Sequence, residues 1–150
     1  MTDSSITARF SLPLLAVAQA QKEVTHNEAL TLLDALVAPT VETGPQNDPP
    51  PAPLVGQVWL VGDVPTSAWI GAPGALALWT AGGWRFIAPR AGMRITRLDD
   101  GLCLCFDGTM WSVPPAIGTP AGGAVVDTEA RAVIGALISC LSAHGLLIAG

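Results

Sequence analysis

The sequence predicts an α+β fold, in which an N-terminal helical segment and a C-terminal helix flank a small antiparallel β-meander or barrel. Apolar residues recur at three- and four-residue intervals over residues 25–37 and again over 127–143, which is typical of helices that bury one face. Between them, residues 57–113 hold short apolar and aromatic runs separated by turn residues, and this pattern indicates strands.

These patterns divide the chain into five parts. We predict an arm with docking and oligomerisation helices at 1–38, a proline-rich linker at 39–56, the β-domain at 57–113, a second linker at 114–124 and the C-terminal helix at 125–150. The first linker should be a stiff spacer, because consecutive prolines favour an extended chain. Recognition by a proline-binding module is the alternative reading of the same run.

The N-terminal part is predicted to contain an arm and two helices. Residues 1–10 are polar and lack periodicity, so they are expected to form a mobile or docking arm. A short helix should follow over residues 11–22, with Ser11 as its cap and Pro13 in its first turn.

The second of these helices is the best specified in the chain. Thr25 and Glu28 have the spacing of a capping box, in which each side chain binds the backbone amide of the other residue. Pro39 should end this helix, since the residue before a proline avoids helical geometry. Its apolar stripe consists of Ala29, Leu30, Leu33, Leu36 and Val37.

Six or seven short strands are expected in the β-domain. Turn residues at 81–83, 99–101 and 107–108 predict tight hairpins. The run at residues 102–106 is apolar on both faces and should therefore be a central strand. The predicted strands are residues 58–61, 68–70, 76–79, 84–87, 93–98, 102–106 and 110–113.

The C-terminal helix has clear signals at both ends. Asp127 is the expected cap, Glu129 lies in the first turn where negative charge suits the helix dipole, and His144-Gly145 is typical of a helix end. A terminal helix this apolar needs a partner, and parallel association about a symmetry axis would supply one. Its stripe consists of Ala130, Val133, Ile134, Leu137, Ile138 and Leu141.

Composition favours an assembly component. Half of the residues are apolar and only 13 % are charged, which is few for the surface of a free monomer. The net charge of −5 argues against nucleic-acid binding, which requires clustered Lys and Arg. The apolar stretches at 12–20 and 134–148 are too short or too interrupted for a signal peptide or a membrane span, so neither secretion nor membrane insertion is expected.

No metal site, cofactor or disulfide framework is expected. Cys103 and Cys105 are neighbours on one strand face and Cys140 is distant, a pattern that fits synthesis in a reducing compartment. His26 and His144 lack ligand spacing to a cysteine.

Characteristic segments extend over residues 10–113. They read Leu12-Pro-Leu-Leu15, Ala20-Gln-Lys-Glu-Val-Thr-His-Asn-Glu-Ala-Leu30, Leu33-Asp-Ala-Leu-Val37, Gly56-Gln-Val-Trp59, Ser67-Ala-Trp-Ile-Gly71, Gly83-Trp-Arg-Phe-Ile-Ala-Pro89 and Phe106-Asp-Gly-Thr-Met-Trp111. Together they resemble a family of uncharacterised domains that recurs in tail-fibre and head-spike proteins of bacteriophages and gene transfer agents. The tail, from Val126 to Ile148, is similar to a helix that often ends such virion proteins. No catalytic residues are known for the family, so the resemblance implies none here.

The resemblance and the composition together predict a non-enzymatic virion structural protein. It would be the base or adaptor of a head spike or tail fibre, made in the bacterial cytoplasm and located on the virion surface. Its partners would be further copies of itself, as a trimer or pentamer, and other virion proteins of the capsid, tail or fibre. The expected oligomer interface consists of Asn27, Leu30, Leu33, Leu36, Ile134, Leu137 and Leu141.

The alternative is a carbohydrate-binding module for bacterial capsule or surface glycan. Exposed tryptophans on a rigid β-surface stack on sugar rings, whereas buried ones fill a small core. Trp69 is the best exposed candidate because it lies beside Gly71 near a turn, and Trp79 and Trp111 are further candidates. The aspartates of the β-region lie mainly in turns, where backbone geometry alone explains them, so sugar cleavage is not expected.

Overall fold

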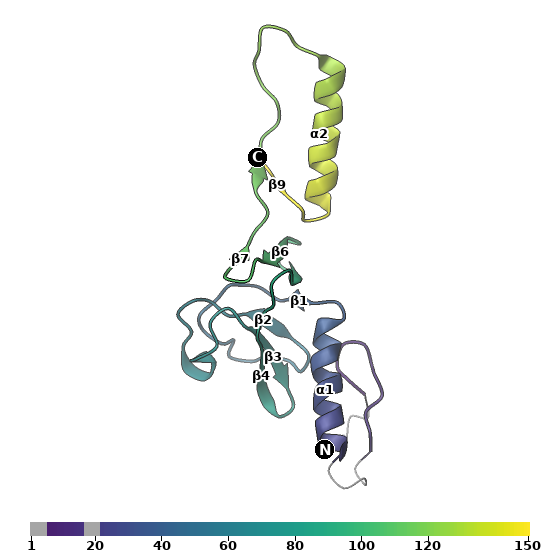
Figure 1. The fold of residues 1–150 in the computed structure, drawn as a ribbon, viewed down its shortest axis with the longest axis vertical. Helices are drawn as coiled ribbons and strands as arrows, with labels where there is room; N and C mark the ends of the chain where they lie inside the picture. Colours follow the sequence, from purple (N-terminus) through teal and green to yellow (C-terminus); the bar gives the residue numbers. More distant parts are fainter. Residues whose placement is uncertain (1–5, 17–21) are drawn as a thin grey trace. The chain divides into compact units, whose positions relative to one another are not determined.

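The structure, a computed structural model, describes residues 6–16 and 22–150 (Figure 1). It contains two helices and several short antiparallel strands, which confirms the predicted α+β class, although among the described residues no sheet closes into a barrel. The chain forms two compact units, residues 1–89 and 90–150. This boundary lies within the predicted β-domain of 57–113, because β2, β3 and β4 pair in one sheet while β5, β6 and β7 pair in another.

The first unit is built on a three-stranded antiparallel sheet in the order β2-β3-β4. The strands are Val58–Leu60, Leu76–Thr80 and Gly83–Ile87, and the last two form the predicted hairpin. Leu78 lies opposite Arg85 and Trp79 lies opposite Trp84. Since side chains alternate along a strand, the first pair lies on one face of the sheet and the tryptophan pair on the other.

The predicted strand at 68–70 is wrong. Residues Ser67–Trp69 instead form a single turn of 3-10 helix, in which the Trp69 amide donates to the Thr66 carbonyl at 2.9 Å. Ser67 has a φ of 50°, in the left-handed region that no extended strand contains. The turn directs Trp69 into the core of the unit.

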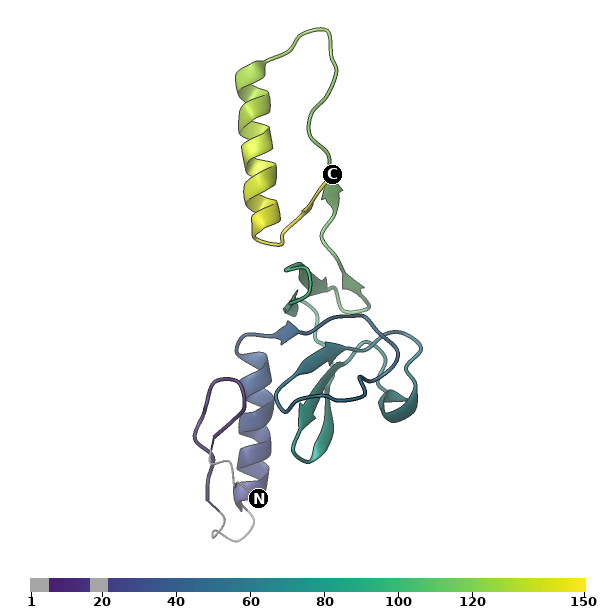
Figure 2. The same cartoon turned by 180° about the vertical axis from the view of Figure 1, so that it is seen from behind.

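Helix α1, Lys22–Leu36, lies beside the sheet in both views of the fold (Figures 1 and 2). It begins three residues before the predicted capping box, so Thr25 and Glu28 lie inside the helix and the capping box is wrong. Glu28 is instead available for a tertiary contact, because its carboxylate accepts from Arg85 of β4. The helix ends before Pro39 as predicted.

Residues 6–16, here called the N-terminal loop, do not form the predicted helix. Ile6 and Pro13 pair as an antiparallel bridge, and the Thr7 amide donates to the Leu12 carbonyl at 2.9 Å. Ser11 has a φ of 55°, which turns the chain back on itself. The remainder of the predicted helix and the first half of the predicted arm lie outside the described residues.

The predicted proline-rich linker, residues 39–56, lies entirely within the first unit. It contains the short strand β1, Thr40–Val41. The residues after β1 bind β2 through the backbone: the Glu42 amide donates to the Val58 carbonyl at 2.7 Å, and the Gln46 amide donates to the Leu60 carbonyl at 3.0 Å. Residues 42–46 therefore supply backbone hydrogen bonds to an edge of the sheet that would otherwise be open.

The second unit begins with three antiparallel strands, β5 (Arg94–Arg97), β6 (Cys103–Phe106) and β7 (Trp111–Ser112). The first two form the predicted hairpin, and β6 lies between its neighbours as expected for a central strand. In the turn between β5 and β6, the Arg97 guanidinium donates a hydrogen bond to the Asp100 carboxylate. This bond lowers the pKa of the Asp100 carboxyl and raises the pKa of Arg97.

The C-terminal helix agrees with its predicted signals. Helix α2 spans Thr128–Ala143, and the Asp127 carboxylate caps it by accepting from the Ala130 amide at 2.8 Å. At the other end the Gly145 amide donates to Ser142 and the Leu146 amide to Leu141, which is the Schellman pattern. Two short strands pair in parallel on either side of α2 in the sequence: β8 (Ala116–Ile117) precedes the helix and β9 (Ile148–Ala149) follows it.

Over the described ranges, neither helix has the length and apolarity needed to cross a membrane.

Candidate functional site

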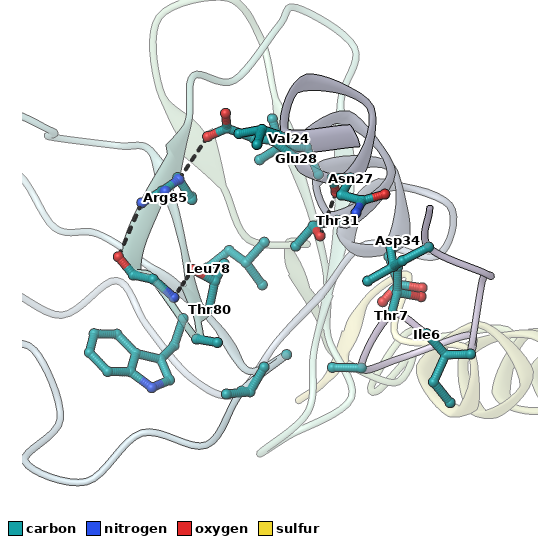
Figure 3. A pocket seen from close by; sticks show the side chains of 18 residues that line it. Ile6, Thr7, Val24, Asn27, Glu28, Thr31, Asp34, Leu78, Thr80 and Arg85 are labelled. Carbon is teal, nitrogen blue, oxygen red and sulfur yellow. Dashed lines mark hydrogen bonds and ion pairs between the residues drawn. The ribbon is translucent and has the colours of Figure 1, made fainter. Parts of the chain in front are cut away.

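A cavity of about 700 Å³ opens on the first unit, and we call it the α1 groove (Figure 3). Its walls are the N-terminal loop, helix α1, residues 55–56 and the β3–β4 hairpin. Leu14, Leu32 and Leu78 line it, while Ile6, Val24 and Val55 lie at its mouth and are exposed. An open cavity with a largely apolar lining and a few polar groups has the character of a binding site.

The groove face of α1 differs from the face that the sequence predicts for contact. Val24, Asn27, Glu28, Thr31 and Leu32 line the groove at helical spacing. The sequence signal for this face is weak, because polar residues alternate with the apolar ones along it. The sequence therefore pointed to Asn27 of this face, as an interface residue, but did not reveal the groove.

Of the predicted interface residues of α1, Asn27 lines the groove and the three leucines lie elsewhere on the helix. Leu33 is exposed, whereas Leu30 and Leu36 are half-buried, and none of the three lines the groove. Asn27 has a contact within its own chain: its side-chain amide donates to the Leu15 carbonyl at 3.0 Å and its carbonyl accepts from the Leu15 amide at 2.9 Å. This paired contact resembles one rung of a β-ladder and holds the N-terminal loop against α1.

Asp34 is the second attachment point of the loop. It is buried, and its two carboxylate oxygens accept from the backbone amides of Arg9 and Phe10, each at 2.8 Å. The Arg9 guanidinium in turn donates to the Thr40 hydroxyl and to the Ala38 carbonyl. The loop wall of the groove is thus held by charge-assisted hydrogen bonds to one buried carboxylate.

We expect Asp34→Ala to release the N-terminal loop, because it leaves two backbone amides without their acceptor. Hydrogen exchange should show faster exchange of the Arg9 and Phe10 amides, by at least about tenfold, with α1 amides little changed. Asp63→Ala is the matched control, since Asp63 is exposed. Unchanged protection of both amides would contradict this role of Asp34.

An ion pair spans the rim of the groove. The Arg85 Nε of β4 donates to the Glu28 carboxylate of α1 at 2.8 Å (Figure 3). Arg85 Nη1 also donates to the Trp84 carbonyl at 3.1 Å. Both side chains are substantially exposed, so the pair contributes little stability but links the helix to the hairpin. With Glu28 paired and Asp34 bound to amides, the arrangement suits binding better than acid–base chemistry.

Four tryptophans form a cluster on the face of the β2-β3-β4 sheet that is opposite to the side chains of Leu78 and Arg85. Trp84 is at its centre, with edge-on contacts to Trp79, Trp69 and Trp59 at ring-centroid distances of 4.8, 5.2 and 5.6 Å. Trp69 is 0 % exposed, so the expectation that it is exposed for sugar contact is wrong. The 3-10 turn directs it inward, which the neighbouring Gly71 does not reveal.

Two other glycan candidates keep partial exposure. Trp79 is half-buried and shares its face with half-buried Trp84 and with Phe86, which is 40 % exposed. In the second unit, Trp111 is half-buried and tilts against Phe106 at 5.2 Å. The first group thus places three partly exposed aromatic side chains on one face of a sheet, two of which are in ring contact.

Helix α2 exposes most of its apolar stripe. Of the predicted interface residues, Ile134, Leu137 and Leu141 are all exposed, and Leu137 is 57 % exposed. Ile138 is the one buried residue of the helix. The stripe therefore has no cover within the second unit.

The three cysteines are free thiols, half-buried at Cys103 and Cys105 and exposed at Cys140. Within the part of the chain that the structure describes, no three His, Cys, Asp or Glu side chains gather in a manner that could hold a metal ion.

Comparison with known proteins places the chain in a family. A family model described as "Protein of unknown function (DUF2793)" matches residues 26–112, more than half of the 150-residue chain. None of the curated proteins matches the chain. The chain therefore belongs to the DUF2793 family, and its match covers α1 from His26 onward, the groove-lining hairpin and the strands as far as β7.

Proposed function

We propose that this member of the DUF2793 family is a non-enzymatic structural subunit of a virion. It would form the base or adaptor of a head spike or tail fibre of a phage or gene transfer agent and contribute to attachment to the host surface. It would be made in the bacterial cytoplasm and lie on the surface of the particle.

The uncovered apolar stripe of α2 is the observation that carries this proposal. An exposed apolar stripe that contains Ile134, Leu137 and Leu141 is typical of a surface that another molecule covers. The low proportion of charged residues along the chain supports the same conclusion, as does the resemblance of its segments to spike and fibre proteins. Together these features suit a subunit whose surface is buried in an assembly.

The test is whether the protein is part of particles. An epitope-tagged full chain would be produced in the bacterium that encodes it, and particles would be purified on a density gradient. We expect the tagged protein to sediment with the major capsid protein at a fixed ratio, and a cytoplasmic enzyme with the same tag to be absent. Tagged protein that stays at the top of the gradient would refute the virion role.

Glycan binding is a second candidate, favoured by the partly exposed surface of Trp79, Trp84 and Phe86. Aromatic rings that are held rigidly by a buried cluster below them are suited to stacking on sugar rings. We expect Phe86→Ala to weaken binding to surface polysaccharide from the host by at least about fivefold in calorimetry. Met110→Ala, an exposed apolar residue of the second unit, is the control. Equal binding by wild type and both variants would exclude this surface as the glycan site.

A further inference from the structure

The α1 groove is an apolar surface that no described residue of the first unit fills. Its α1 wall extends from Val24 to Asp34, a rise of about 15 Å along the helix axis. Val24 is 62 % exposed at the mouth, and Ile6 and Val55 beside it are exposed as well. Exposed aliphatic side chains around an open apolar cavity indicate a surface for a partner.

The chain itself carries a segment with matching chemistry. The exposed stripe of α2 extends from Val133 to Leu141, a rise of about 12 Å along the helix axis. After Arg131 the rest of the chain contains no Asp, Glu, Lys or Arg. The stripe is therefore an uncharged helix face of about the length of the groove, a pattern that suits insertion of a helix into an apolar groove.

We infer that α2 of one copy docks in the α1 groove of a second copy. The groove would surround the stripe with three walls, which are α1, the β3–β4 hairpin and the N-terminal loop. Pairing with a second α2 helix would cover the stripe from one side. The Glu28–Arg85 pair at the rim leaves no unpaired charge on those two side chains against the incoming helix. Val24 and Leu32 would then pack against Leu137 and its neighbours.

This contact is heterologous, because it joins two different surfaces of the same chain. Such contacts generate closed rings when the rotation closes and open chains when it does not. The inference rests on the proposed function, since it names how copies of a spike or fibre subunit would join. It predicts that each copy has one donor helix and one acceptor groove.

Two full-length variants test the contact by complementation. Val24→Asp places a charge in the mouth of the groove and leaves α2 intact, while Leu137→Asp places a charge in the stripe and leaves the groove intact. Both positions are exposed, so folding should survive, and circular dichroism would verify this. The matched controls are Val64→Asp, on an exposed residue outside the groove lining, and Ser139→Asp, on the opposite face of α2.

Sedimentation velocity over a range of concentrations supplies the readout. We expect wild type and both controls to associate, each groove or stripe variant to associate at least about tenfold more weakly, and their equimolar mixture to form a 1:1 dimer. Dimers should not grow further, because each pair uses its single intact groove and single intact helix.

Other outcomes would overturn the inference. If Val24→Asp associates like wild type while Leu137→Asp does not, the α2 helices pair with one another. If the mixture stays monomeric, or wild type remains monomeric at high concentration, no groove-to-helix contact exists. The gradient experiment on particles decides the virion role separately, because it does not depend on this contact.

Discussion

Replacing Trp69 with alanine is expected to lower the free energy of unfolding of the first unit by about 3–5 kcal/mol. Trp69 is completely buried, and its ring packs edge-on against Trp84 at 5.2 Å. Removing the indole leaves a cavity beneath the sheet that the surrounding rings would fill only in part. Denaturant unfolding followed by tryptophan fluorescence would measure the change.

Trp69→Phe is the informative control. The Trp69 indole Nε1 is buried without a hydrogen-bond acceptor among the described residues, so phenylalanine removes an unsatisfied donor while it keeps most of the ring. We expect it to lose less than half of the stability that alanine loses. If the alanine variant keeps its stability but loses binding to polysaccharide, Trp69 is exposed after all and our placement of it is wrong.

Replacing Gly145 with alanine is expected to destabilise the C-terminal end of α2. Gly145 has a φ of 67°, a conformation that costs an L-residue about 1–2 kcal/mol. An added Cβ would also lie 2.1 Å from the Gly101 carbonyl oxygen, and this backbone atom cannot move without displacing the turn before β6. The loss of stability should therefore exceed the cost of the backbone conformation alone.

Gly135→Ala provides a control with the opposite sign. Gly135 lies inside α2, and an added Cβ there meets no atom within 4 Å. Alanine should therefore stabilise the helix by about 1 kcal/mol, through its higher helix propensity. Thermal unfolding followed at 222 nm would compare the two variants. A Gly145→Ala protein at least as stable as wild type would show that the glycine is not required at this helix end.

Local signals predict both ends of the C-terminal helix, although the predicted segment 125–150 also contains the short strand β9. Glu129 lies in its first turn, and Asp127 and Gly145 each form a hydrogen bond with a backbone group three residues away at its two ends. The hairpins that turn at 81–83 and 99–101 are equally predictable, since turn chemistry is also local. In each case the interacting groups are close in sequence, so the pattern contains the information needed.

Longer-range contacts explain the failures near the N-terminus. Asp34 and Asn27 bind backbone groups of residues 9, 10 and 15, which are 12 to 25 positions away. These bonds hold residues 6–16 as a loop although Ser11 and Pro13 are suited to a helix start. Glu28 likewise pairs with Arg85, 57 positions away, and not with the backbone at Thr25.

From the sequence one can read the α+β class, the C-terminal helix with both of its ends, the hairpins and the apolar stripe of α2. Those features depend on backbone propensity and on side-chain periodicity, which are properties of short segments. The burial of Trp69, the N-terminal loop and the α1 groove appear only in the tertiary structure. Each of them arises where segments distant in sequence meet, and no local pattern specifies which surfaces will face one another.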